Sequence, residues 1–102
     1  MYRARDQVEH QQWIERLESA VNELGFSEQA YTTAVDLFLA DVPEEEESKP
    51  TALAASLYAG ALIAEENPSQ TEVADACDVA RLSVQQHWKE RIKIAGLTPP
   101  AW

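Results

Sequence analysis

Residues 52–64 read ALAASLYAGALIA, a run of alanine, leucine and isoleucine that only Ser56, Tyr58 and Gly60 interrupt. A helix of this length spans about 20 Å, too short to cross a bilayer. Because a helix that is apolar on every side has to be buried on every side, the stretch predicts the central helix of a bundle. Ser48 is its expected N-cap and Pro50 lies in its first turn, giving a helix over residues 50–66.

Four further helices are expected around this one, because proline and glycine fall between apolar segments of helical period and no alternating strand pattern occurs. They are predicted at residues 7–24, 28–40, 70–77 and 81–95, with a tail over residues 97–102. Local signals support these ends: capping boxes at Asp6/Glu9 and Ser69/Glu72, an N-cap at Ser27, and stops at Gly25 and Gly96. The predicted fold class is all-α, a five-helix bundle in one domain over residues 1–102.

The composition is strongly acidic, with 8 Lys+Arg against 18 Asp+Glu and a net charge of −10. This balance disfavours nonspecific binding to nucleic acid or to an anionic membrane. The favoured interpretation is a solvated surface suited to a salty cytoplasm, as in a halophile; the alternative is a docking surface for a basic partner. With no apolar leader or membrane span visible, we expect a cytoplasmic protein without a membrane partner.

No set of residues suggests catalysis or a metal site, so we expect no enzyme and no cofactor. His10 and His87 fall on different helices, and neither has a metal-ligand partner at usable spacing. The single cysteine, Cys77, can form no internal disulfide, and it is expected to pack as a small apolar residue. The run 44–47, four adjacent glutamates, is expected to form an exposed loop.

Residues 70–88 read QTEVADACDVARLSVQQHW, which has the spacing of a short helix, a tight turn and a second helix. Ala74 stands where only a small side chain lets two helices cross. The expected core between them is Val73, Val79 and Val84. Asp78 occupies the turn position that usually takes glycine, and aspartate tolerates the left-handed conformation better than most residues.

The charge is divided unevenly along the chain. Residues 81–102 hold four basic residues against Glu90, a balance of +3, whereas residues 1–80 hold four against seventeen acidic ones, a balance of −13. The second helix therefore carries half of the basic residues, and several polar ones recur at helical spacing. Glutamine can pair with adenine edges, and arginine or lysine with guanine or phosphate. A simpler interpretation is that cations near the C-terminus of a helix interact favourably with its dipole. This explains Lys89, Arg91 and Lys93 but not Arg81.

Three segments carry a family resemblance: Lys49-Pro50 with ALAASLY at 52–58, QTEVA at 70–74, and LSVQQHWKE at 82–90. In order and spacing they resemble one cyclin-like repeat of the transcription initiation factor IIB family, closest to the archaeal transcription factor B. The resemblance covers roughly residues 8–97. It implies a five-helix cyclin-like bundle whose helix-turn-helix contacts promoter DNA, while other surfaces hold the TATA-binding protein.

By that resemblance, Leu82, Ser83 and Gln85 match base-facing positions, and Arg81, Lys89 and Arg91 would lie near phosphates. The family usually has arginine where this chain has Gln85, so a different base preference is expected. The candidate DNA-binding residues are, in full, Arg81, Leu82, Ser83, Gln85, Gln86, Lys89, Arg91 and Lys93.

The chain shows neither the family's zinc ribbon nor a second repeat, so we expect an accessory factor that modulates, competes or recruits. Its expected partners are promoter DNA and the TATA-binding protein or RNA polymerase components. An alternative hypothesis is a protein–protein adaptor of the transcription machinery without DNA binding. A third is a homo-oligomer formed through an exposed aromatic residue such as Trp102.

Overall fold

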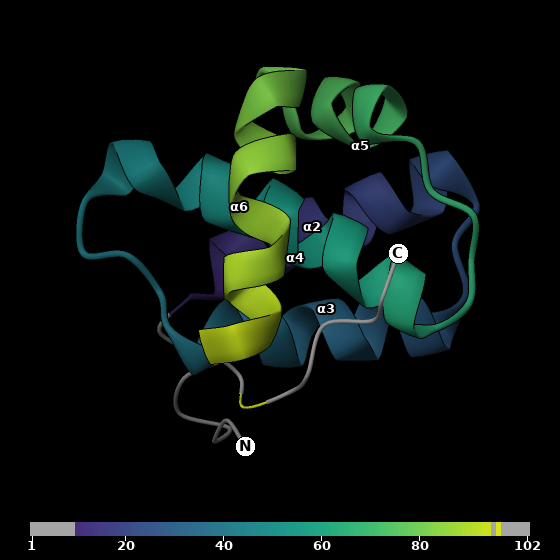
Figure 1. Ribbon diagram of the computed structural model, residues 1–102, viewed down its shortest axis with the longest axis horizontal. Helices are drawn as coiled ribbons and strands as arrows, with labels where there is room; N and C mark the ends of the chain where they lie inside the picture. The colour runs from purple at the N-terminus through teal and green to yellow at the C-terminus, as the bar shows by residue number, and fades with distance from the viewer. Residues whose placement is uncertain (1–9, 95, 97–102) are drawn as a thin grey trace.

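The computed structural model describes residues 10–94 and Gly96, and this part of the chain is helical with no strand (Figure 1). The elements, in chain order, are α2 (Gln11–Leu24), α3 (Glu28–Ala40), η1 (Glu46–Ser48), α4 (Lys49–Ile63), α5 (Gln70–Cys77) and α6 (Arg81–Ile94). The predicted all-α fold with five helices is therefore confirmed. The Asp6/Glu9 capping box, residue 95 and the tail with Trp102 lie outside the described residues.

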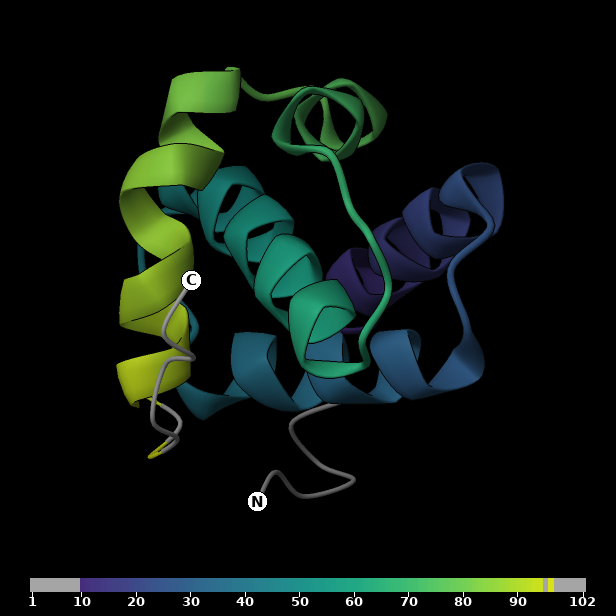
Figure 2. The ribbon, with the colours of Figure 1, turned by 45° about the vertical axis from the view of Figure 1, so that its right-hand side comes forward.

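Helix α4 runs through the middle of the bundle and contacts α2, α3, α5 and α6 (Figure 2). Leu53 and Leu57 are at most 1% exposed, and the residues between them are fully buried. This burial confirms the central helix predicted from residues 52–64. Between residues 52 and 63 of this helix, Ser56 is the one buried polar residue.

Both ends of α4 differ from the sequence prediction. Ser48 makes no side-chain capping bond, because it belongs to the short helix η1 that leads directly into α4. At the other end α4 stops at Ile63, because Glu65 adopts a positive φ of 62°. The backbone N–H groups of Glu65 and Glu66 then donate to the carbonyls of Leu62 and Ala61, which is a Schellman closure without glycine.

Helices α3 and α4 approach each other closely at Gly60 in the core. A Cβ atom added at Gly60 would lie 2.8 Å from the backbone nitrogen of Ala34 and 3.0 Å from its Cα. Only glycine permits this approach, which brings the two helix backbones together.

Helix α3 begins with two linked caps. The Ser27 hydroxyl accepts a hydrogen bond from the backbone N–H of Ala30 at 3.2 Å, as its predicted N-cap role requires. The backbone N–H of Ser27 in turn donates to Glu66 Oε1 at 3.0 Å, across 39 residues of sequence. The chain that leaves α4 is thereby tied to the start of α3.

Candidate nucleic-acid interface on α5 and α6

The segment from α5 to α6 folds as a short helix, a tight turn and a longer helix. Ser69 caps α5 by accepting from the backbone N–H of Glu72 at 3.3 Å. Asp78 ends α5 in the left-handed conformation, with φ 58° and ψ 47°, and the N–H of Val79 reaches back to the carbonyl of Ala74. The predicted role of Asp78 as a non-glycine turn residue is confirmed.

The interior of this unit is small and apolar, as predicted. Val73 and Val84 are fully buried, Ala74 is buried, and the half-buried Val79 packs against the same core. Cys77 is also buried there, and burial raises the pKa of its thiol to about 11, a shift that nearby Arg16 opposes. The thiol is therefore protonated at neutral pH and packs as an apolar group.

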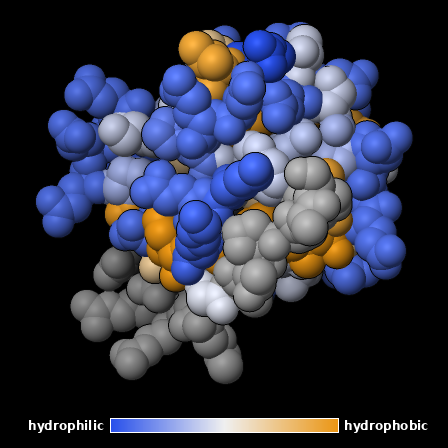
Figure 3. Space-filling model, viewed as in Figure 1, coloured by the Kyte–Doolittle hydropathy of each residue, from blue (hydrophilic) through white to orange (hydrophobic). Residues whose placement is uncertain are grey.

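One side of α6 carries four exposed residues in a single row, which we call the α6 row: Leu82, Gln86, Lys89 and Lys93. Their spacings of four, three and four residues place them on the same helix face. Val84 lies on the opposite, buried face of α6, and Lys89 Nζ lies 5.5 Å from the centre of the Trp88 ring at the edge of that face. Figure 3 shows a mainly hydrophilic surface over α6 with an apolar patch at its N-terminal end, the end that carries Leu82, 52% exposed.

Three more predicted residues lie beside the row. Arg81 and Gln85 are exposed, and Ser83 is half-buried. Arg81 Nη1 donates to Gln70 Oε1 at 3.2 Å and to Gln85 Oε1 at 3.0 Å. Arg81 therefore links the first residue of α5 to the second turn of α6 and fixes the orientation of the Gln85 amide.

Arg91 corrects the sequence-based prediction, because it lies in the core and is only 5% exposed. Its Nη2 donates to the carbonyl oxygens of Leu37 at 2.9 Å and Phe38 at 3.0 Å, and its Nε donates to Ser56 Oγ at 3.2 Å. The two carbonyls belong to the last turn of α3, where helical carbonyls lack partners within the helix. Arg91 thus stabilises the end of α3 and is not available to a phosphate.

A signal for this burial is present in the sequence. Arg91 follows Val84 by seven residues and Trp88 by three, which is the spacing of the buried face of α6. The sequence-based interpretation assigned Arg91 to DNA because it is basic, although its helical spacing matches the buried face. Sequence reasoning also missed the partner of Arg91, which is Ser56 in the central helix.

Burial of Arg91 changes the charge balance of the unit. Residues 70–94 now present three exposed cations, Arg81, Lys89 and Lys93, against four exposed carboxylates. The carboxylates are those of Glu72, Asp75, Asp78 and Glu90. Burial lowers the pKa of Arg91, whereas Asp41 and Glu90 favour its charged form. Within residues 70–94, the exposed positive charge is therefore confined to α6.

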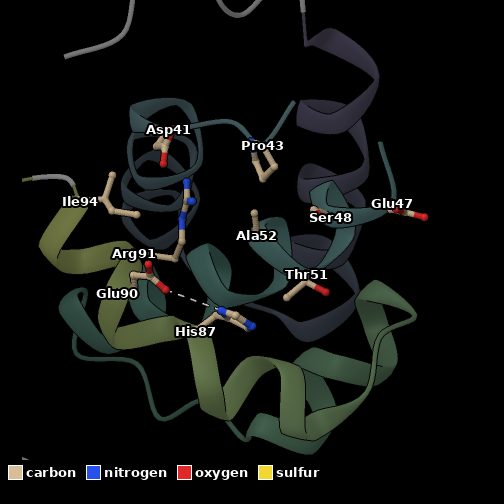
Figure 4. Close-up of a pocket in the computed structure, with 10 residues that line it drawn as sticks. All are labelled: Asp41, Pro43, Glu47, Ser48, Thr51, Ala52, His87, Glu90, Arg91 and Ile94. Atoms are coloured by element: carbon tan, nitrogen blue, oxygen red, sulfur yellow. Dashed lines mark ion pairs between the residues drawn. The ribbon is translucent and has the colours of Figure 1, made fainter. Parts of the chain in front are cut away.

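A pocket of about 290 Å³ opens on another side of α6, between that helix, η1 and the start of α4 (Figure 4). Carboxylates of Asp41, Glu47 and Glu90 line it together with Arg91, and His87 Nδ1 lies 3.8 Å from Glu90 Oε2. Among the described residues no group of three His, Cys, Asp or Glu side chains could hold a metal ion. No helix in the described part of the chain has the length and apolarity to span a membrane.

Comparison with protein-family models, with curated proteins and with solved structures finds no match. The resemblance to the transcription factor IIB family therefore rests on the three sequence segments quoted above. The surface of the protein combines the α6 row, the hydrogen-bonded Arg81–Gln85 pair and an excess of exposed carboxylates.

Proposed function

We propose that the protein is a transcription factor IIB-like accessory factor of transcription initiation in a salty archaeal cytoplasm. It contacts promoter DNA through α6 and a transcription partner, such as the TATA-binding protein or RNA polymerase components, through the rest of the bundle. The observation that carries the proposal is the α6 row, because it combines an exposed apolar side chain, an exposed amide and two lysines on one face of the second helix of a helix–turn–helix unit.

The order of residues along α6 suits a recognition helix. Such helices place their N-terminal residues against base edges in the major groove. Leu82, Gln85 and Gln86 occupy the first two turns, whereas Lys89 and Lys93 follow in later turns, where phosphates lie. The acidic remainder of the protein repels DNA weakly in concentrated salt, because the Debye length is only about 3 Å at 1 M.

The proposal is tested by fluorescence anisotropy with labelled duplexes made from promoter fragments. The double variant Gln85→Ala/Lys89→Ala is expected to bind at least about tenfold more weakly, because it loses one base contact and one phosphate contact. The control is Gln12→Ala/Arg16→Ala, which removes an exposed glutamine and an exposed cation at the same four-residue spacing from α2. Equal affinity of the α6 double variant and the wild type would contradict the proposal.

A second candidate function, an adaptor without DNA binding, is favoured by one observation. The α5–α6 unit exposes four carboxylates against three cations, and DNA affinity depends on cations near phosphates. In that case the nuclease-treated protein should still capture purified TATA-binding protein or RNA polymerase, and the duplexes should not bind. Failure to capture either protein after nuclease treatment would count against the adaptor.

A further inference from the structure

The two adjacent glutamines of α6 have different surroundings. Gln85 Oε1 accepts a hydrogen bond from Arg81 Nη1 at 3.0 Å, and the same nitrogen donates to Gln70 at 3.2 Å. The exposed side chain of Gln86 has no hydrogen-bond partner within residues 10–94. One amide is therefore held by the protein, and the other is free to pair with a ligand.

This difference favours a different base for each amide. Bidentate pairing with adenine needs both amide groups, because the carbonyl oxygen accepts from N6 while the NH₂ group donates to N7. The carbonyl of Gln85 already accepts a hydrogen bond from the Arg81 cation, which weakens it as an acceptor for a base and leaves the NH₂ group as its stronger partner. An amide that acts mainly as a donor matches the two acceptors of guanine, N7 and O6. Gln86 retains the donor and the acceptor that adenine requires.

Leu82 lies beside Gln86 in the α6 row. Residues four apart on a helix have Cβ atoms about 6 Å from one another, so the two side chains can reach the same base pair or adjacent pairs. Leu82 is 52% exposed and is one of two large hydrophobic side chains exposed in the described part of the chain. An apolar side chain at a base edge contacts the C5-methyl group of thymine.

We infer that Gln86 and Leu82 recognise an adenine–thymine step in the major groove, and that Arg81 positions Gln85 to favour guanine at the neighbouring pair. The inference rests on the proposed function and adds the class of sequence that is bound. It assigns the adenine contact to Gln86, although Gln85 is the residue at the base-facing position by resemblance.

The test begins with selection of duplexes from a randomised pool by the full chain. Binding of the selected duplex is then measured by anisotropy for the wild type and for Gln86→Met and Gln85→Met, which keep the side-chain length and remove the amide. The wild type should prefer adenine at one position by about tenfold. Gln86→Met should lose that preference and keep the guanine preference, while Gln85→Met should do the reverse.

Base analogues test the same contacts from the DNA side. Replacing the selected adenine by 7-deazaadenine should weaken binding of the wild type several-fold and leave Gln86→Met unaffected. Replacing the thymine by uracil, which lacks the methyl group, should weaken the wild type and leave Leu82→Ala unaffected. Arg81→Met should release Gln85 and replace the guanine preference at the neighbouring pair by adenine, a change that a purely structural role of Arg81 would not produce.

The outcomes separate this inference from the function on which it rests. Binding with an adenine preference that persists in Gln86→Met, or binding with no base preference, would overturn the inference and leave DNA binding in place. An unchanged guanine preference in Arg81→Met would overturn the role given to Arg81. Absence of binding to the whole pool would overturn both the inference and the proposed function.

Discussion

Arg91 Nε donates a hydrogen bond to Ser56 Oγ at 3.2 Å, and this buried pair joins α6 to the central helix α4. The same guanidinium reaches the last turn of α3 through Leu37 and Phe38. One cation on α6 therefore holds this helix to α3 and α4, whose bonded residues lie 35 to 54 residues away in sequence. Arg91 belongs to the structural core, and the outer face of α6 remains free to bind a ligand.

Replacing Arg91 by methionine should destabilise the fold by about 3 kcal/mol, because Ser56 and two carbonyls would lose their charged donor inside the protein. Urea unfolding followed by circular dichroism measures this. Lys93→Met is the matched control on the exposed side of α6, and it should change stability by less than about 0.5 kcal/mol. Equal stability of Arg91→Met and the wild type would show that the buried bonds are not needed.

Asp78→Gly should stabilise the protein by about 0.5–1 kcal/mol, because glycine adopts the left-handed conformation without the Cβ penalty. Asp75→Gly, the same substitution inside α5, should destabilise by a similar amount, because glycine is a poor helix former. Thermal unfolding of the two variants compares them directly. A loss of stability in Asp78→Gly would contradict this prediction. It would mean that the aspartate side chain stabilises the fold by more than its left-handed backbone conformation destabilises it.

Gly60→Ala should destabilise the bundle by about 1–3 kcal/mol, although alanine is the better helix former, because the new Cβ would clash with the backbone of Ala34. Since the nearest atoms are the nitrogen and Cα of Ala34, the second substitution Ala34→Gly should not restore stability. The melting temperatures of the single and double variants decide this. Full recovery in the double variant would contradict the backbone contact.

Stability should fall as pH rises from 9 to 11, in part because of Cys77. Burial raises the pKa of the thiol from 9.0 in the unfolded chain to about 11 in the folded protein. Between pH 9 and pH 11, the unfolded state therefore releases the thiol proton while the folded state keeps it. The contribution to the free energy of unfolding is fully present below pH 9 and is lost as the pH rises through 11. This loss amounts to roughly 2 kcal/mol. Because other groups also titrate there, the quantity to measure is the difference from Cys77→Ala in urea unfolding at pH 8 and 10.5. Parallel losses in both proteins would exclude this role of the thiol.

Local signals in the sequence predicted the helices well, and tertiary contacts account for the errors. The bounds of α3 and α5 follow from the caps Ser27 and Ser69, which act within one helical turn. The early end of α4 depends on a positive φ at Glu65, for which the sequence offers no glycine as a sign. Burial of Arg91 depends on acceptors at Leu37, Phe38 and Ser56, which lie 35 to 54 residues away.

The salt dependence of DNA affinity, measured by anisotropy for the wild type and for Lys89→Gln/Lys93→Gln, tests the central claim most directly. With two or three phosphate contacts from Arg81, Lys89 and Lys93, log K against log salt should have a slope of about −2 to −3 for the wild type. The double variant should reduce the magnitude of that slope by about 2. An unchanged slope in the double variant, or no binding by the wild type at low salt, would contradict the claim that the outer face of α6 contacts DNA.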